Sequence, residues 1–182
     1  MPSPVGHTLI SSTITVIFLR KEYLKTHLKF IIPFIIIISI FPDLDLLWDL
    51  SGHTPLIHHT FTHSFFTPVI LSLLYSIFAL LKKIKIHYEL MIMFCIIYFL
   101  HSGADYYAID LKEPIGLMLF WPFSDTYYIS SHPFFMPLFK ETINQFFLKQ
   151  NFYALASELL LVIPLTCAIL LRWYLDKKSF SK

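Results

Sequence analysis

The sequence contains few charged residues, few glycines and only two cysteines. Charged side chains make up 14% of the 182 residues and hydrophobic ones 56%, and the mean hydropathy is +0.65. A soluble domain of this size needs more polar surface than such a composition supplies. The shortage of charge therefore excludes an ordinary water-soluble domain and predicts that lipid solvates much of the chain.

The cysteines and the small net charge exclude two further classes. Cys95 and Cys167 lie in separate apolar runs, which argues against a disulfide framework or a thiolate metal site. The formal net charge is only +2, and the 14 basic residues form short clusters beside apolar runs. Such clusters do not make the continuous basic face that follows a phosphate backbone, so we expect no nucleic-acid partner.

The apolar runs predict an all-α membrane protein with about five transmembrane helices. Runs 64–81 and 151–171 are long enough to cross a bilayer, and Glu158 is the only charge in either. Three further runs of about 15 residues fall below the usual minimum of about 17: 5–19, 28–41 and 90–104. Each can span if flanking lysines reach the interface, or can be re-entrant. The first run has no preceding Lys or Arg and no small-residue cleavage pattern after it, so we expect no cleaved signal peptide.

The basic residues predict how the runs cross. All but Lys112, Lys140 and Lys149 cluster between the first and second runs, between the third and fourth, and after the fifth: Arg20, Lys21, Lys25 and Lys29; Lys82, Lys83 and Lys85; Arg172, Lys177, Lys178 and Lys182. If all five runs cross, the three clusters share the cytoplasmic side, as the positive-inside rule requires. The N-terminus then lies outside and the C-terminus in the cytoplasm. We expect one domain over 1–182, with outer loops at about 42–63 and 105–150, the second folded back as a cap.

All histidines except His27 and His87, and several aspartates, fall on the predicted outer side, at span ends or in adjoining loops. Among them are His7, Asp43, Asp45, His58, His63, His101 and Asp105. Ionisable groups at membrane depth are costly and mark functional sites when they converge. His53, His59 and His132 can be spare ligands or surface residues, and we favour the surface. Glu158 can face the site or lie near the interface, and the sequence does not decide between the two.

Two short motifs suit metal ligands but also suit helix ends. His101 and Asp105 are four residues apart, which places both on one helical face with Cβ atoms about 6 Å apart. The alternative is a His paired with a helix-end Asp. Asp43 and Asp45 follow Pro42 directly and can bind one metal or bridge two, or can cap a helix.

A third motif opens the run at 64–81. His58 and His63 are five residues apart, a spacing that a regular helix does not align but that a turn before a helix can. Thr62 and Ser64 beside His63 are candidates for helix capping or for hydrogen bonds that orient a ligand histidine. His7, at the start of the first run, is a further candidate ligand.

The residue types predict a divalent metal ion. Histidine nitrogen and carboxylate oxygen together suit zinc, our first choice, with manganese or iron as alternatives. The sequence contains no GxSxG, no HExxH and no phosphate-cradling glycine-rich loop that would indicate another chemistry.

The motifs as a set resemble the YdjM-like inner-membrane proteins, a family described as metal-dependent hydrolases and as LexA-binding. The family pattern comprises an early His, PDLD, HR with THS four residues later, HxxxD, and a Gly before WPF. The chain matches it in order over about 1–128, with Gly116 preceding the final motif. Where the family has Arg, this chain has His59, which lacks the forked donors that grip an anionic oxygen. The resemblance implies a bacterial inner-membrane location.

These observations together predict a membrane-bound metal-dependent hydrolase with its site at the membrane interface. We expect His7, Asp45, His63, His101 and Asp105 as metal ligands. Asp43 and His58 are assigned to catalysis, as general base or as partners of the ligands. The expected substrate is a phosphate ester or another small or lipid-linked molecule, with membrane lipids as neighbours. The alternative is a divalent-metal transporter or a non-catalytic metal-binding membrane protein.

Overall fold

The computed structural model describes residues 2–19, 21–45, 59–111, 113–139, 145 and 147–179. These residues are mainly helical and contain no named strand, only two isolated bridges, Ala108 with Phe135 and Leu117 with Tyr128. The α-helices are α1 (Pro4–Phe18), α2 (Lys21–Ile40), α4 (Phe66–Leu81), α5 (Tyr88–Tyr106) and α7 (Lys149–Ser179). Two short 3-10 helices, η1 (Phe41–Asp45) and η2 (Phe61–His63), lie between α2 and α4. The helical fold class is therefore confirmed.

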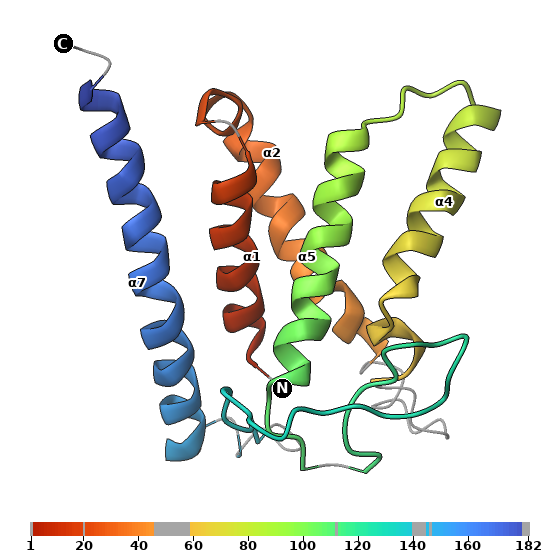
Figure 1. The fold of residues 1–182 in the computed structure, drawn as a ribbon, viewed down its shortest axis with the longest axis vertical. Coiled ribbons are helices and arrows are strands. Elements are labelled where there is room, and N and C mark those ends of the chain that lie inside the picture. The colour runs from red at the N-terminus through yellow and green to blue at the C-terminus, as the bar shows by residue number, and fades with distance from the viewer. Residues whose placement is uncertain are drawn as a thin grey trace.

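The helices lie side by side, and the chain reverses direction from each α-helix to the next (Figure 1). One end of the bundle carries the start of α1, the end of α5 and the long connection that follows it, while the loop between α4 and α5 lies at the other end (Figure 1). Helix α1 packs against α2, α5 and α7, and α5 also packs against α2 and α4. Helices α1 and α5 therefore form the centre of the bundle.

Apolar side chains on this bundle face outward as well as inward. A small core of Ile31, Ile35, Met93 and Ile97 joins α2 to α5. Large hydrophobic residues are nevertheless widely exposed, such as Leu81 at 78% and Leu160 at 75%. Meanwhile α1 buries polar residues, among them Ser11, Thr13 and Thr15. An apolar exterior around a partly polar interior is the arrangement expected in lipid.

Two helices among the described residues are long and apolar enough to cross a membrane, Thr26–Asp45 and Lys149–Leu171. Two shorter apolar helices are Pro4–Phe18 and Phe66–Leu81. The run at 64–81 thus forms a helix of only 16 residues, shorter than the span predicted there. The predicted spans 28–41 and 90–104 instead belong to longer helices. Helices α2 and α5 begin before the apolar runs, with polar residues in their first turns. The five-span arrangement stays a prediction.

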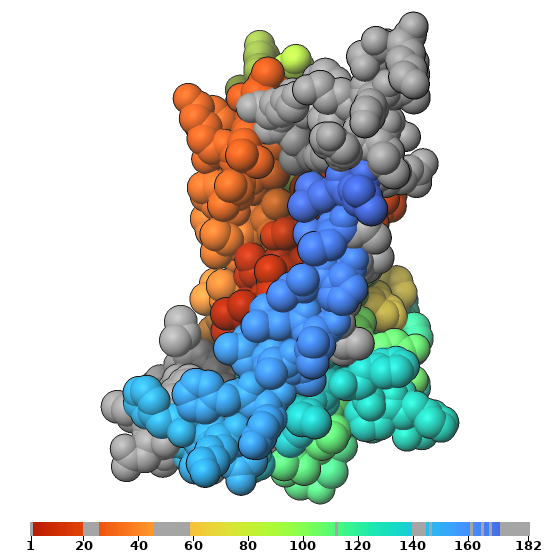
Figure 2. All heavy atoms as spheres, turned by 90° about the vertical axis from the view of Figure 1, so that its left-hand side faces the viewer, coloured from red at the N-terminus to blue at the C-terminus, as the bar shows by residue number. Residues whose placement is uncertain are grey.

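Helix α7 is attached to the bundle through polar contacts with α1, across which it lies in Figure 2. Glu158, fully buried within α7, accepts hydrogen bonds from the backbone N–H of Ser3 at 2.7 Å and from the Ser3 hydroxyl. Further along, the hydroxyls of Thr13 and Thr166 are 2.7 Å apart. Ser3, the N-cap residue of α1, therefore supplies the hydrogen bonds that this buried carboxylate needs. The contact also fixes that end of the helix.

Gly6 makes the close approach of Glu158 possible. A Cβ atom at Gly6 would lie 2.5 Å from Glu158 Oε2, inside van der Waals contact. We expect Gly6→Ala to displace the carboxylate from Ser3 and to destabilise the protein by about 1–3 kcal/mol. Gly103→Ala in α5 is the matched control, because a Cβ there meets no atom within 4 Å. Thermal unfolding in detergent, followed by circular dichroism, compares them, and equal unfolding temperatures would contradict the proposed role of Gly6.

Candidate metal centre

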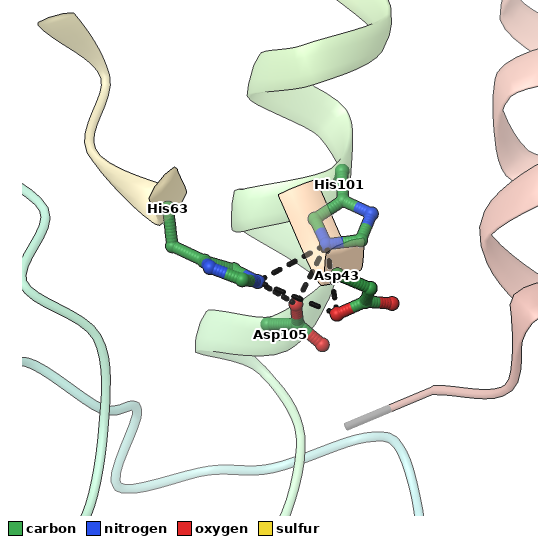
Figure 3. Close-up of side chains that lie close together, drawn as sticks. All are labelled: Asp43, His63, His101 and Asp105. Atoms are coloured by element: carbon green, nitrogen blue, oxygen red, sulfur yellow. Dashed lines mark hydrogen bonds and ion pairs between the residues drawn. The ribbon is translucent and has the colours of Figure 1, made fainter. Parts of the chain in front are cut away.

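Four side chains from three parts of the chain converge at the end of the bundle (Figure 3). Asp43 comes from η1, His63 from η2, and His101 and Asp105 from the last turns of α5. One ligand atom of each lies within 4.8 Å of the other three. The spacing of four residues brings His101 and Asp105 onto one face of α5, as the sequence predicted, and their side chains are 3.2 Å apart.

Five of the six distances between these atoms are close to those of a coordination sphere. The Nε2 atoms of His63 and His101 are 3.2 Å apart. Asp43 Oδ1 lies 3.6 Å from each imidazole nitrogen, and Asp105 Oδ2 lies 3.4 Å from His63 Nε2 and 3.2 Å from His101 Nε2. Four atoms about 2.0–2.1 Å from a tetrahedral zinc ion lie roughly 3.3–3.4 Å from one another. The arrangement therefore fits a divalent ion at its centre.

The carboxylate atoms of the cluster lack hydrogen-bond donors. Asp43 Oδ1 and both carboxylate oxygens of Asp105 are buried without a hydrogen-bond partner. Leaving a buried charged acceptor without a donor is costly. Two carboxylates and two imidazoles are the donor set that zinc, manganese and iron accept in proteins. A bound cation would satisfy these oxygens, so the residues present fit the ion that the sequence predicted.

His101 is oriented from α2. Its Nδ1 donates a hydrogen bond of 2.8 Å to the backbone carbonyl oxygen of Ser39. In the neutral ring this leaves the lone pair on Nε2, the atom that points into the cluster. A backbone carbonyl on the outer nitrogen of a ligand histidine is a usual feature of metal sites. The last turn of α2 thus sets the tautomer of a residue on α5.

His63 is oriented by Thr62 and Asp45. Its Nδ1, on the side away from the cluster, lies 3.1 Å from the Thr62 hydroxyl and 3.7 Å from Asp45 Oδ2. Thr62 also donates to that same carboxylate oxygen, and the Tyr98 hydroxyl donates to the Thr62 carbonyl oxygen at 2.5 Å. A carboxylate behind a ligand histidine fixes its ring and raises its basicity.

The protonation of His63 is governed by opposing effects. Burial is the largest and lowers its pKa, but the carboxylates of Asp105 and Asp43 reverse this and raise the pKa above its ordinary value. A metal ion binds the neutral imidazole, so an incoming cation competes with the proton that these carboxylates favour.

The structure exchanges the two aspartates of the PDLD motif relative to the sequence assignment. Asp45 was assigned as a ligand and Asp43 to catalysis, but Asp43 Oδ1 points into the cluster and Asp45 lies behind His63. His7 lies beside the cluster, with Nε2 3.4 Å from Asp105 Oδ1, and is not one of the four. His58 lies outside the described residues.

A fourth histidine is buried at this end of the bundle. His59 was expected at the surface, but it is buried, and its Nδ1 lies 3.4 Å from Asp110 Oδ2. Its ring meets His63 edge to face, with centroids 4.9 Å apart. The signal that could have indicated this is its position at the family's Arg, a residue that grips an anionic oxygen. His132 is exposed, as predicted.

The connection after α5 covers this end of the bundle. The Ser64 hydroxyl donates to the carbonyl oxygens of Leu119 and Trp121, and the backbone N–H of Met118 donates to the His59 carbonyl oxygen. Gly116 has φ +99°, and a Cβ there would lie 2.7 Å from the Tyr128 carbonyl oxygen, so only glycine fits. The residues between Gly116 and Pro122 thus fasten the segment to the residues around His63, while Gly116 lets the segment pack on itself at Tyr128.

The different positions of Asp43 and Asp45 predict different effects when each is changed. Asp43→Asn alters a ligand atom and should lower the number of ions bound. Asp45→Asn keeps an acceptor behind His63 and should leave that number unchanged while weakening affinity about 10–100-fold. Zinc titration of chelator-treated protein with a competing dye measures both quantities. The reverse pattern would restore Asp45 as the ligand.

An apolar-surfaced helical bundle with a buried His and Asp cluster at one end defines a membrane-type helical protein with a candidate metal centre. Residues 1–178 match the family of the YdjM inner membrane protein. The chain therefore belongs to that family, and the resemblance that its motifs predicted is confirmed. No curated protein and no solved structure matches the chain significantly.

Proposed function

We propose that this chain is a multi-span inner-membrane hydrolase that uses a divalent metal ion, with the N-terminus outside and the C-terminus in the cytoplasm. Its proposed substrate is a phosphate ester or a lipid-linked molecule at the outer interface. One observation carries the proposal: four ligand atoms from separate parts of the fold meet at coordination distances, and the carboxylate atoms among them lack other donors.

The proposed roles of the residues follow from their contacts. Asp43, His63, His101 and Asp105 would hold the ion, while Ser39 and Thr62 keep the two imidazoles in the orientation required. A divalent ion in such a site activates water and stabilises negative charge that develops on a substrate oxygen. Zinc is our first choice because two imidazoles and two carboxylates suit it, and manganese or iron would accept the same donors.

Substrate would reach the centre past Asp43. The Asp43 side chain is 9% exposed, whereas those of His63, His101 and Asp105 are at most 1% exposed. Of the four ligands, Asp43 is therefore the one nearest to solvent or lipid head groups. A site at the ends of the helices suits a head group that lies at the membrane surface.

The proposed function predicts metal-dependent turnover. Purified protein in liposomes, stripped with a chelator, should not hydrolyse phosphomonoesters, phosphodiesters or phospholipid head groups, and should hydrolyse at least one of them once Zn²⁺, Mn²⁺ or Fe²⁺ is restored. Asp43→Asn should abolish this gain, whereas His132→Ala, a change at an exposed residue, should leave it intact.

The same liposomes separate the proposal from metal transport. A transporter would carry the ion into the vesicle interior, and usually binds it near the membrane midplane with access from both sides. Uptake of Zn²⁺ or Mn²⁺ without turnover of any substrate in the panel would contradict the proposed hydrolase and favour transport.

A further inference from the structure

The two carboxylate oxygens of Asp105 face different histidines. Oδ2 belongs to the cluster of four, 3.2 Å from His101 Nε2. Oδ1 faces His7 instead, and lies 3.4 Å from its Nε2. Neither oxygen has a hydrogen-bond donor. Each oxygen of this carboxylate therefore faces an imidazole nitrogen without making a regular hydrogen bond to it.

His7 is a buried polar residue without a hydrogen bond. It is 1% exposed, and neither of its ring nitrogens has a partner. Its ring stacks on His101, with centroids 3.9 Å apart and planes at 20°. Burying an imidazole without a hydrogen bond is unfavourable unless something else satisfies it.

The separation of His7 from Asp105 is that of two ligands. A good N–H to carboxylate hydrogen bond would bring the heavy atoms to about 2.7–2.9 Å. The observed 3.4 Å equals the distance between His63 Nε2 and Asp105 Oδ2 within the cluster, and agrees with the roughly 3.3–3.4 Å expected between atoms that share one ion. The pair therefore repeats, on the other side of the carboxylate, the geometry of the first centre.

We propose that His7 Nε2 and Asp105 Oδ1 bind a second divalent cation, and that Asp105 bridges the two ions. The inference rests on the proposed function, because the bridge requires the first ion. Carboxylate-bridged pairs lie about 3.5–4 Å apart and hold the attacking and leaving oxygens of a phosphoryl group between them. Two carboxylates balance the charge of one divalent ion, so a second ion adds positive charge that attracts an anionic phosphate group.

The start of α1 is fixed before any ion arrives. The His7 backbone N–H donates to the Ser3 carbonyl oxygen at 3.0 Å, and Ser3 is in turn held by Glu158 of α7. The Ser3 hydroxyl also accepts from the Gly6 N–H at 2.9 Å and caps the helix. These contacts set the depth of His7, so its imidazole is already placed beside Asp105.

Titration with Mn²⁺ tests the second position. Full-length protein in detergent, stripped with a chelator, should bind two Mn²⁺ per chain, the second more weakly, and its electron paramagnetic resonance spectrum should show a spin-coupled pair. His7→Gln should bind one Mn²⁺ with an uncoupled spectrum. Ser11→Ala is the matched control, a buried residue one turn along the same helix, and should behave as the unaltered protein.

The outcomes separate this inference from the proposed function. Saturation at one Mn²⁺ per chain without coupling would overturn the second position and leave the first centre standing. Binding of no Mn²⁺, Zn²⁺ or Fe²⁺ would overturn both. Two coupled ions in His7→Gln would overturn the assignment of His7. Should that variant fail to fold, the stoichiometry and spectrum of the unaltered protein still decide.

Discussion

His101→Ala or Asp105→Ala should remove most of the bound metal from the purified protein. Each side chain supplies an atom to the cluster of four, and His101 is additionally aligned by the Ser39 carbonyl. The loss of affinity should exceed the roughly 10–100-fold that removing an outer hydrogen-bond partner costs. The fold should largely survive, because helices in lipid are held by packing along their whole length. Metal content per chain, on protein that elutes as a single species, is the measurement.

The control for these variants is His87→Ala. His87 is exposed and precedes α5, at the end of the bundle opposite to the cluster (Figure 1). It should leave bound metal unchanged. Full metal content in the His101 and Asp105 variants would instead mean that the pair are ordinary polar residues at a helix end.

Single cysteines at positions 85 and 125 should be labelled from opposite sides of the membrane. The predicted topology places Lys85 in the cytoplasm and Asp125 outside, and the segments that carry them lie at opposite ends of the bundle (Figure 1). In spheroplasts of a variant without Cys95 and Cys167, an impermeant maleimide should label Asp125→Cys directly. Lys85→Cys should react only after the membrane is permeabilised.

Because a residue is either accessible or not, the expected labelling difference is close to all or none. Labelling of both positions from one side would contradict the five-span topology. It would also remove the argument that the cluster lies at the outer interface, since that argument depends on which end of the bundle faces outward.

Three members of the cluster, His63, His101 and Asp105, were among the predicted ligands because they lie at the ends of apolar runs. Charges and imidazoles are costly within a membrane, so a His or Asp there requires a partner. The His101 and Asp105 pair could be placed on one face because the spacing of four is fixed by helix geometry. The same reasoning pointed to His63 and to Thr62 beside it.

The choice between Asp43 and Asp45 could not be made from the sequence. Both follow Pro42, and either suits a ligand. They fold into the 3-10 helix η1, in which residues two apart point about 120° away from each other around the axis because there are three residues per turn. Only one of them can face the cluster. Which one does so depends on how η1 packs against η2, and the local sequence does not indicate that contact.

Long-range polar contacts were also beyond the sequence. Glu158 binds Ser3, 155 residues away in the sequence, and His59 pairs with Asp110. In neither pair do the two residues belong to one sequence motif. A buried carboxylate in a long apolar run indicates that a partner exists but does not identify it. The helix lengths differ from prediction for a related reason: helices continue through polar residues at their ends while a hydropathy pattern stops there.

X-ray absorption at the metal edge of purified, metal-loaded protein tests the central claim most directly. The cluster of Asp43, His63, His101 and Asp105 predicts a bound divalent ion with imidazole nitrogen and carboxylate oxygen ligands at about 2.0–2.1 Å if the ion is zinc. Asp43→Asn should alter that spectrum, whereas Asp45→Asn should preserve the set of ligand atoms. A protein that binds no divalent ion, or a spectrum with sulfur ligands from Cys95 or Cys167, would contradict it.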